Sequence, residues 1–182
     1  MTDKVLGIDV SKWQDDNSTP QRMNFETAYN AGARFVFIKA SQQLWKDEDI
    51  IVNWQNAKTA GLLRGAYHFL TWDKPAKDQA RYFWSVIQSD PGELPPVCDF
   101  EWWNGMIPSY GFSMVRDFMN EIKLLSGKTP ILYTGYSIWI NYGRNAPEWL
   151  QYPLWLAYYA AEQYIRIPPP WTRWTFWQYT SK

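Results

Sequence analysis

The chain has little cysteine, little histidine and no net charge. Of its 182 residues, one is cysteine, Cys98, and one is histidine, His68. A single cysteine excludes an intrachain disulfide, and no His or Cys spacing typical of a metal site occurs, so we expect no metal and no cofactor. Lys plus Arg and Asp plus Glu both number 18. A balanced charge favours neither nucleic acid nor an acidic membrane as a partner.

Long apolar runs are absent as well. No stretch is long enough to span a membrane, and the first ten residues, MTDKVLGIDV, lack the apolar run of a signal peptide. We therefore expect synthesis in the cytoplasm without a signal peptide, so that action outside the cell would need release or another means of export. No linker or repeat divides residues 1–182, and this length suits one domain, which we expect to be a monomer.

Aromatic residues, in contrast, are abundant. The chain has 13 Trp, 12 Tyr and 9 Phe, which together make up 19% of it. Aromatic rings that line a groove suit the apolar faces of sugars. An aromatic-rich core would explain the same composition, so the count alone leaves both interpretations open.

Short apolar stretches alternate with stretches of helical pattern. We predict strands within residues 6–13, 34–41, 64–72, 95–103, 129–136, 153–160 and the C-terminal WTFWQYTS segment, and helices over residues 24–32, 49–60, 75–88 and 111–126. Strands that alternate with helices indicate parallel βαβ units. Because the strands are almost continuously apolar, both faces of the sheet should be covered.

Polar residues recur at the ends of the apolar runs, and this pattern favours a barrel over an open sheet. They are Asp9, Lys39, His68, Asp99 with Glu101, and Gln178. In a β/α barrel the carboxyl ends of the strands converge on one catalytic face. The nucleotide-binding fingerprints of open sheets are missing. We predict an α/β fold, an irregular and compact (β/α) TIM-like barrel with reduced helices in its C-terminal half.

The stretch PPVCDFEWW, residues 95–103, carries two acids two residues apart. Asp99 and Glu101 would lie on the same face of a strand. Neighbouring carboxylates repel, so one pKa rises, and we expect a raised pKa for Glu101 among the rings of Phe100, Trp102 and Trp103. This division of roles suits acid-catalysed glycoside hydrolysis. Acids that cap a helix or pair with Lys or Arg would give the same pattern.

Seven motifs in order resemble glycoside hydrolase family 25, the N-acetylmuramidase lysozymes of bacteria, fungi and many phage endolysins. They run from residue 6 to residue 181 and read GIDVSKWQ, FVFIKAS, AGLLRGAYHFL, VCDFEWW, ILYTGY, PLWLAYY and WTFWQYTS. The resemblance implies an irregular β/α barrel that cleaves the β-1,4 bond between N-acetylmuramic acid and N-acetylglucosamine in peptidoglycan. The glycan strands of the bacterial cell wall would then be the partner.

The resemblance also implies roles for the three acids. Glu101 matches the proton donor of the family. Asp99 matches the aspartate that orients or stabilises the 2-acetamido group of the substrate, so that hydrolysis proceeds with retention by substrate assistance. Asp9 matches the acid of the first strand, which lines the same pocket.

Further side chains at the predicted barrel mouth are candidates for substrate binding. They are Lys39, Tyr67, Phe69, Tyr133, Trp155, Tyr159 and Gln178. Core packing is an alternative for each aromatic residue, and an ion pair with Asp9 or Asp99 is an alternative for Lys39.

The chain departs from the family pattern in two places. The family continues after W-Q-Y to a further aspartate, whereas this chain stops at Lys182. The family segment K-A-[ST]-E-G reads here with Gln42 and Gln43 at its last two positions. We expect the three remaining acids to suffice, with Asp73 or Glu162 as the alternative sources of a replacement carboxylate.

Other activities fit the sequence less well. A barrel that only binds glycan would have no need of the proton donor, although the missing C-terminal acid favours it. A chitinase-like hydrolase normally carries more carboxylates along the same strand. A nucleophilic pair of Cys98 and His68 is disfavoured because Cys98 alternates away from Asp99, toward the helices.

Overall fold

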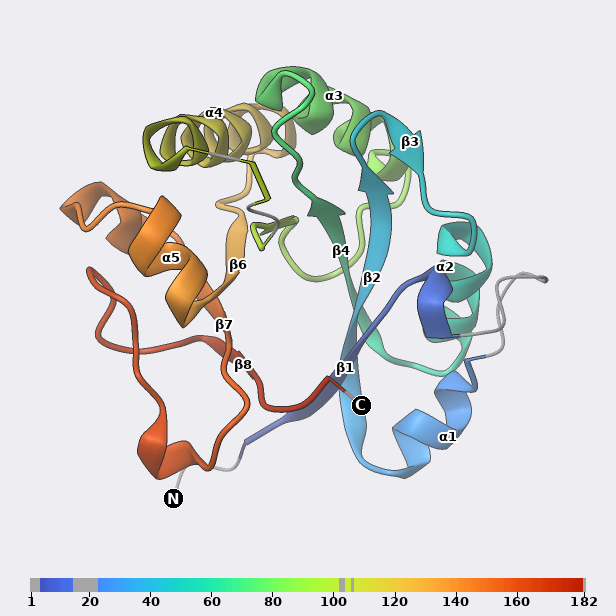
Figure 1. The fold of residues 1–182 in the computed structure, drawn as a ribbon. Helices are drawn as coiled ribbons and strands as arrows, with labels where there is room; N and C mark the ends of the chain where they lie inside the picture. The colour runs from blue at the N-terminus through green and yellow to red at the C-terminus, as the bar shows by residue number, and fades with distance from the viewer. Residues whose placement is uncertain (1–3, 15–22, 102–103, 106, 182) are drawn as a thin grey trace.

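The fold is built on a curled sheet of mainly parallel strands, with helices around its outer face (Figure 1). It is seen in a computed structural model of the chain that describes residues 4–14, 23–101, 104–105 and 107–181. In the part of the chain so described, no helix has the length and apolar character needed to cross a bilayer.

Seven parallel strands form the sheet in the order β1-β2-β4-β5-β6-β7-β8, with β3 beside β2. Their bounds are β1 Leu6–Val10, β2 Ala33–Gln42, β3 Trp45–Lys46, β4 Leu63–Phe69, β5 Val97–Asp99, β6 Ile131–Gly135, β7 Leu154–Ala157 and β8 Phe176–Gln178. Among the described strands only β3 is antiparallel, and it folds back on the end of β2. The predicted α/β barrel fold is therefore confirmed in its parallel order, and β3 is the strand that the sequence missed.

Helices cover the outer face of the first half of the sheet. The α-helices are α1 Phe25–Asn30, α2 Ile50–Thr59, α3 Ala76–Ile87, α4 Pro108–Ser126 and α5 Tyr136–Tyr142, and the 3-10 turns are η1 Lys12–Gln14, η2 Pro147–Gln151 and η3 Glu162–Tyr164. After β6 the chain forms only the short α5 and η2, and after β7 only η3. The predicted reduction of helices in the C-terminal half is confirmed.

Local signals explain where the helices begin and end. The Asn24 side chain accepts a hydrogen bond of 2.9 Å from the Thr27 amide, so it caps an otherwise unpaired donor at the start of α1. Helix α4 begins at Pro108, whose fixed φ suits the first turn. It ends at Gly127, which adopts a left-handed φ of 67° that other residues rarely take.

Strands β5 and β7 are shorter than predicted. β5 ends at Asp99, because its neighbours β4 and β6 supply only one further bond each, Leu70 N to Asp99 O and Phe100 N to Tyr133 O. Glu101 therefore follows the strand and does not lie on it. β7 ends at Ala157, so Tyr159 also lies beyond its strand. The predicted strand positions of Trp102 and Trp103 fall outside the described residues.

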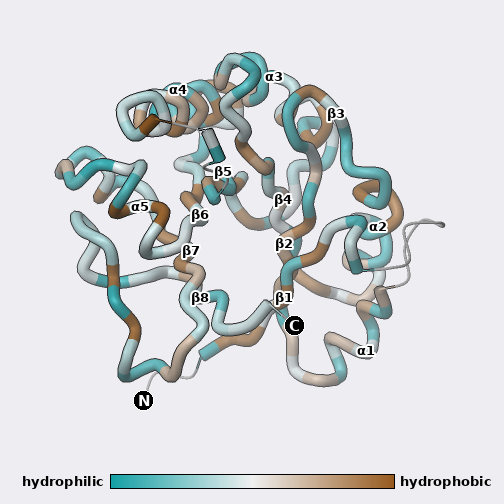
Figure 2. Tube along the Cα trace, viewed as in Figure 1, coloured by the Kyte–Doolittle hydropathy of each residue, from teal (hydrophilic) through white to brown (hydrophobic). Residues whose placement is uncertain are grey.

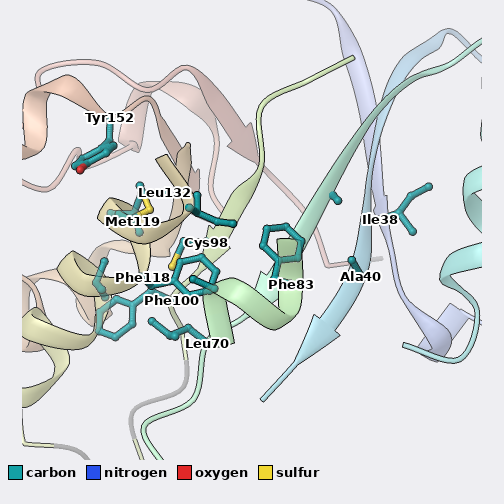
Figure 3. Close-up of a cluster of buried hydrophobic side chains, with 14 of the residues drawn as sticks. Ile38, Ala40, Leu70, Phe83, Cys98, Phe100, Phe118, Met119, Leu132 and Tyr152 are labelled. Carbon is teal, nitrogen blue, oxygen red and sulfur yellow. The ribbon is translucent and has the colours of Figure 1, made fainter. Parts of the chain in front are cut away.

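The core has two layers, one on each face of the sheet. The outer layer lies between the sheet and the helices, where Cys98, Phe100 and Leu132 pack near Phe118 and Met119 of α4 (Figure 3). The inner layer fills the barrel with Phe37, Val97, Ile131, Tyr133 and Trp155. Hydrophobic residues thus recur along the strands, as the brown segments near β2 and β7 show (Figure 2).

Aromatic rings fill the barrel interior by lying over glycines of neighbouring strands. Gly65 of β4 is the register partner of Phe37 of β2. A Cβ at Gly65 would meet ring atoms of Phe37 at 2.4 Å. The Phe37 ring stacks in turn on Trp155 at a centroid distance of 4.4 Å. We call this packed inner layer the floor of the barrel, because the polar side chains at the carboxyl ends of the strands lie next to it.

Candidate active site

Four polar side chains lie at the carboxyl ends of the strands, above the apolar floor of the barrel. Asp9, Lys39, Asp99 and Gln178 come from β1, β2, β5 and β8. Each lies on the inward face because it is two residues beyond an interior position on its strand, as Lys39 is beyond Phe37 and Asp99 beyond Val97. Parallel strands point the same way, so the sheet brings these ends together.

A chain of hydrogen bonds links Asp9 to Glu101 across the site. The Gln178 amide donates to both oxygens of Asp9, at 3.1 and 3.0 Å. The Gln178 carbonyl oxygen accepts from the Tyr133 hydroxyl at 2.9 Å and from the Tyr159 hydroxyl at 2.8 Å. The Tyr133 hydroxyl also lies 3.5 Å from Oε2 of Glu101. Gln178 is therefore the hub of the site, because its nitrogen donates to Asp9 and its oxygen accepts from two tyrosine hydroxyls.

The Asp9–Gln178 contact also joins the two ends of the sheet. Among the described strands, β1 and β8 form the ends of the hydrogen-bonded order. Gln178 bonds to Asp9 across this seam, and Phe35 of β2 contacts Phe176 of β8 at 5.4 Å between ring centroids. Side chains thus bridge the seam both near the start of the strands, at Phe35 and Phe176, and at their carboxyl ends, at Asp9 and Gln178.

The Asp99 carboxyl is buried, and one of its oxygens lacks a hydrogen-bond partner among the described residues. Its residue is 5% exposed, and its Oδ1 has no hydrogen-bond partner within the part of the chain that the structure describes. Burial raises the pKa of Asp99 well above its usual range, and the charge of Glu101 raises it further. Lys39 opposes both effects. Buried polar atoms are nearly always paired, so this oxygen is free to accept a hydrogen bond from a water or a bound molecule.

Glu101 sits at the mouth of the barrel beside Asp99. The residue is exposed as a whole, but its carboxyl end turns toward Tyr133. Loss of surrounding water raises the pKa of Glu101, while the Tyr133 hydroxyl and the Lys39 charge act in the opposite direction. Asp9 likewise has a raised pKa because it is buried, although its bond with Gln178 opposes that rise.

The expected surroundings of Glu101 need correction. The Phe100 ring is buried on the helix side of the sheet, against Trp139 at 6.5 Å between centroids. Phe100 lies one residue from Asp99 and from Glu101, and alternation turns its ring away from the site. Trp102 and Trp103 lie outside the described residues. The raised pKa of Glu101 agrees with the expectation, but Phe100 is not its cause.

Lys39 does not form the ion pair with Asp9 or Asp99 that the sequence left open as an alternative to substrate binding. Its ammonium donates to Oε1 of Gln42 at 2.8 Å and lies over the rings of Phe69, at 4.8 Å, and Trp45, at 5.6 Å. Within the described ranges, no carboxylate forms an ion pair with it. Burial lowers the pKa of Lys39, while Asp99, Asp47 and Glu101 raise it.

The aromatic candidates divide between the floor and the mouth. Trp155 is 6% exposed and belongs to the inner packing layer, and Tyr67 packs at the edge of that layer. Tyr133 belongs to the same layer, but its hydroxyl reaches the site. Phe69 holds Lys39, and Tyr159 is 58% exposed beside Gln178. The structure therefore brings Tyr133 and Tyr159 to the acids through their hydroxyls.

His68 faces the helices and not the site. Its ring nitrogens lie 2.8 Å from Oγ of Ser41 and 3.1 Å from Oε1 of Gln79, and burial lowers its pKa to about 3. Cys98 is the register partner of His68 and is equally buried, and burial raises the pKa of its thiol well above the usual value. Both residues are parts of the outer core layer, as alternation along the strands requires.

The two possible replacement acids are engaged elsewhere. Asp73 accepts a hydrogen bond from Gln43 at 2.7 Å. Glu162, in η3, pairs with Lys4. Their contacts therefore hold both carboxylates at the periphery.

Asp47 is an organising residue that the sequence analysis missed. It is fully buried, and its two oxygens accept from the amides of Asp49, at 3.1 Å, and Lys12, at 3.5 Å. It thereby ties the turn before α2 to the turn after β1. The acidic run just before a helical pattern was the available signal. Among the described side chains, no group of three His, Cys, Asp or Glu could hold a metal ion.

Comparisons with known proteins agree with this geometry. The profile of "Glycosyl hydrolases family 25" matches residues 8–182. The chain is 32% identical to the uncharacterized protein YegX of Escherichia coli K12, over 98% of this chain and 64% of that protein. It is 31% identical to lysozyme M1 of Streptomyces globisporus, over 99% and 63%. It thus spans less than two thirds of these curated relatives.

A solved structure gives the same result. The muramidase from Trichobolus zukalii superposes with a TM-score of 0.82 and 32% identity, covering 95% of this chain and 86% of that one. The family match spans nearly the whole sequence, and the structural match reproduces the barrel that carries the acids. The chain therefore belongs to glycosyl hydrolases family 25.

Proposed function

We propose that the protein is a lysozyme that hydrolyses the β-1,4 bond between N-acetylmuramic acid and N-acetylglucosamine in bacterial peptidoglycan. Its family membership and the lysozyme and muramidase relatives support this activity. The observation that carries it is the buried Asp99 carboxyl, whose Oδ1 has no partner among the described residues, next to Glu101 at the barrel mouth. A glycan strand of the cell wall would bind across the barrel mouth, to one copy of the chain.

Each acid has a role that suits its surroundings. Glu101 is accessible and has a raised pKa, so it can hold a proton and donate it to the oxygen of the leaving sugar. The acetamido N–H of the substrate would supply the donor that Oδ1 of Asp99 lacks. That bond favours ionised Asp99, which would then orient the acetamido oxygen for attack and stabilise the positive charge that develops.

The remaining groups would hold the substrate and the acids in place. Asp9, fixed by Gln178, would line the pocket floor beside the sugar. Tyr133 and Tyr159, anchored by the same amide, would present ring surface and hydroxyls to the glycan. Reaction by acetamido assistance needs no enzyme nucleophile and gives retention at the anomeric carbon.

Digestion of purified peptidoglycan tests this function. We expect new reducing ends at muramic acid, and the β anomer as the first product. Glu101→Gln should keep the fold and lower the rate by at least about a hundredfold, the usual contribution of a general acid. Glucosamine at the new ends would show a chitinase-like specificity. Binding without release of any reducing end would show a glycan-binding barrel, and would refute hydrolysis.

A further inference from the structure

The ammonium of Lys39 is held in an unusual way for a buried charge. Lys39 is 5% exposed, and buried lysines are normally paired with carboxylates. Its ammonium donates a hydrogen bond instead to a neutral group, the Gln42 amide oxygen, at 2.8 Å. The rings of Phe69 and Trp45 lie under the ammonium. This cage fixes the position of the charge without cancelling it.

The charged groups that face Lys39 come from several elements. Asp99 at the end of β5, Glu101 just beyond it and Asp47 after β3 are acidic, and Lys12 of η1 is basic. Lys12 already pairs with Glu48 at 2.7 Å, and Asp47 accepts hydrogen bonds from backbone amides. Asp9 acts on both Asp99 and Glu101 from β1 and is bound by Gln178. The Lys39 charge therefore acts most strongly on Asp99, and it also acts on Asp47 and Glu101.

We propose that Gln42 is a positioning residue, which fixes the Lys39 ammonium beside Asp99 and Glu101 while leaving its full positive charge to act on them. Gln42 touches no reacting group and acts through Lys39. This role rests on the proposed function of the two acids. It follows from three features of the cage: a neutral acceptor, two rings, and the absence of a carboxylate partner among the described residues.

A change of charge at position 42 should therefore change the pKa values of Asp99 and Glu101. A carboxylate in place of the amide would still accept the Lys39 hydrogen bond, but it would cancel much of the ammonium's field. Asp99 and Glu101 would then lose part of the positive charge that favours their ionised forms. Their pKa values would rise, and the pH profile of hydrolysis would move with them.

The experiment measures the pKa values of the two acids and the pH profile of hydrolysis in the Gln42→Glu variant. Carbon-13 NMR titration of the carboxyl groups gives the pKa values of Asp99 and Glu101 without relying on activity, with Asp99→Asn and Glu101→Gln used for assignment. We expect both to rise by about 0.5–1 unit, the size of a charge interaction over several ångströms in a partly solvated site. Both limbs of the pH–rate profile should shift upward by a similar amount.

Two further variants separate the charge from its position. Lys39→Met removes the charge and should raise the same pKa values at least as much as Gln42→Glu does. Gln42→Met removes the acceptor but keeps the charge, so the released ammonium should give a smaller rise. Gln42→Met also tests the proposal if Gln42→Glu does not fold, as judged by circular dichroism.

A matched control lies far from the site. Gln151 also accepts a hydrogen bond from a lysine, Lys123, at 2.9 Å, but on the exposed side of η2. Gln151→Glu makes the same chemical change there and should leave the pKa values and the pH profile unaltered.

Different results overturn different statements. Unchanged pKa values of Asp99 and Glu101 in the Gln42 variants would refute the role of Gln42, even with an active enzyme. An upward shift of those pKa values in a protein that releases no reducing ends would support the role of Gln42 and refute hydrolysis. An equal shift in Gln151→Glu would show a general charge effect and would also refute the proposal.

Discussion

At the Asp99 carboxyl, protonation is linked to folding. Burial raises the pKa of Asp99 above its value in an unfolded chain, so the folded state binds the proton over a wider pH range. The stability that this group contributes is present below its unfolded pKa of about 4 and is lost as pH rises through the folded value. Near neutral pH, burial of the Asp99 carboxyl therefore lowers the free energy of unfolding.

Asp99→Asn should therefore raise the melting temperature at pH 7, although it removes activity. Asn has the shape of Asp but carries no charge to bury. Each 1 kcal/mol recovered would raise the melting temperature by about 2–4 °C in a chain of this size. The gain should shrink as pH falls toward 4. Differential scanning calorimetry at several pH values checks this, and an Asn variant that melts lower than the parent at pH 7 would contradict it.

Substitution of two peripheral acids tests whether Asp9, Asp99 and Glu101 suffice for hydrolysis. Asp73 and Glu162 are engaged with Gln43 and Lys4, so Asp73→Asn and Glu162→Gln should each keep most of the lytic activity. Asp99→Asn should lose nearly all of it. Initial rates on purified peptidoglycan, with circular dichroism to check the fold, provide the comparison. A large loss from either peripheral variant would show that a fourth carboxylate takes part.

The turn between β2 and β3 carries strain at a single residue. Gln43 has a φ of 51°, in the left-handed region that glycine adopts without cost. The side-chain amide of Gln43 donates a hydrogen bond to Asp73, which offsets part of this strain. Gln43→Ala loses that bond and keeps the strain, whereas Gln43→Gly loses the bond and relieves the strain.

We therefore expect the Gln43→Gly protein to be more stable than the Gln43→Ala protein by about 1 kcal/mol. Urea unfolding of the two variants and the parent measures the difference, and the shared loss of the Asp73 bond cancels between the variants. Equal stability, or a more stable Ala variant, would mean that the left-handed conformation at this turn costs little.

The elements differed in how far the sequence could predict them. α4 was predictable because Gly127 marks its end, although Pro108 starts it earlier than the pattern indicated. β5 was predicted too long, because the length of a strand depends on the partners beside it and not on its own apolar run. β3 has two residues, Trp45 and Lys46, too few for any periodicity to show.

The candidate site, too, could be predicted from the sequence only in part. Strand-end positions and two-residue spacing were enough to predict that Asp9, Asp99 and Glu101 gather at one end of the barrel. The partners of these acids depend on side-chain geometry between distant elements. The hub role of Gln178 arises from its contacts with β1 and β6, and the Lys39–Gln42 bond depends on how β2 ends. Sequence spacing alone could not reveal them.

For the molecule as a whole, the packed interior of the barrel sets the geometry of the site. Gly65→Ala should destabilise the protein by about 1–3 kcal/mol, because the added methyl group would overlap the Phe37 ring. Phe37→Leu alone should also destabilise, through the space that it leaves. The double variant should be more stable than the sum of the two losses predicts, because the smaller side chain makes room for the methyl group.

Urea unfolding of the four proteins in this cycle measures the interaction. If the two losses simply added, the contact between Phe37 and Gly65 would not limit the packing. Hydrolysis rates of the folded variants would show in addition whether a shift of the floor disturbs the acids above it.

The bond between Gln178 and Asp9 joins residues 169 positions apart in the sequence. Contacts of such separation form late, because the loop between them must close before they stabilise anything. During translation the first strand leaves the ribosome long before the residue that will orient its acid has been added to the chain. The nascent polypeptide should therefore lack the contact that orients Asp9 until Gln178 itself has left the ribosome.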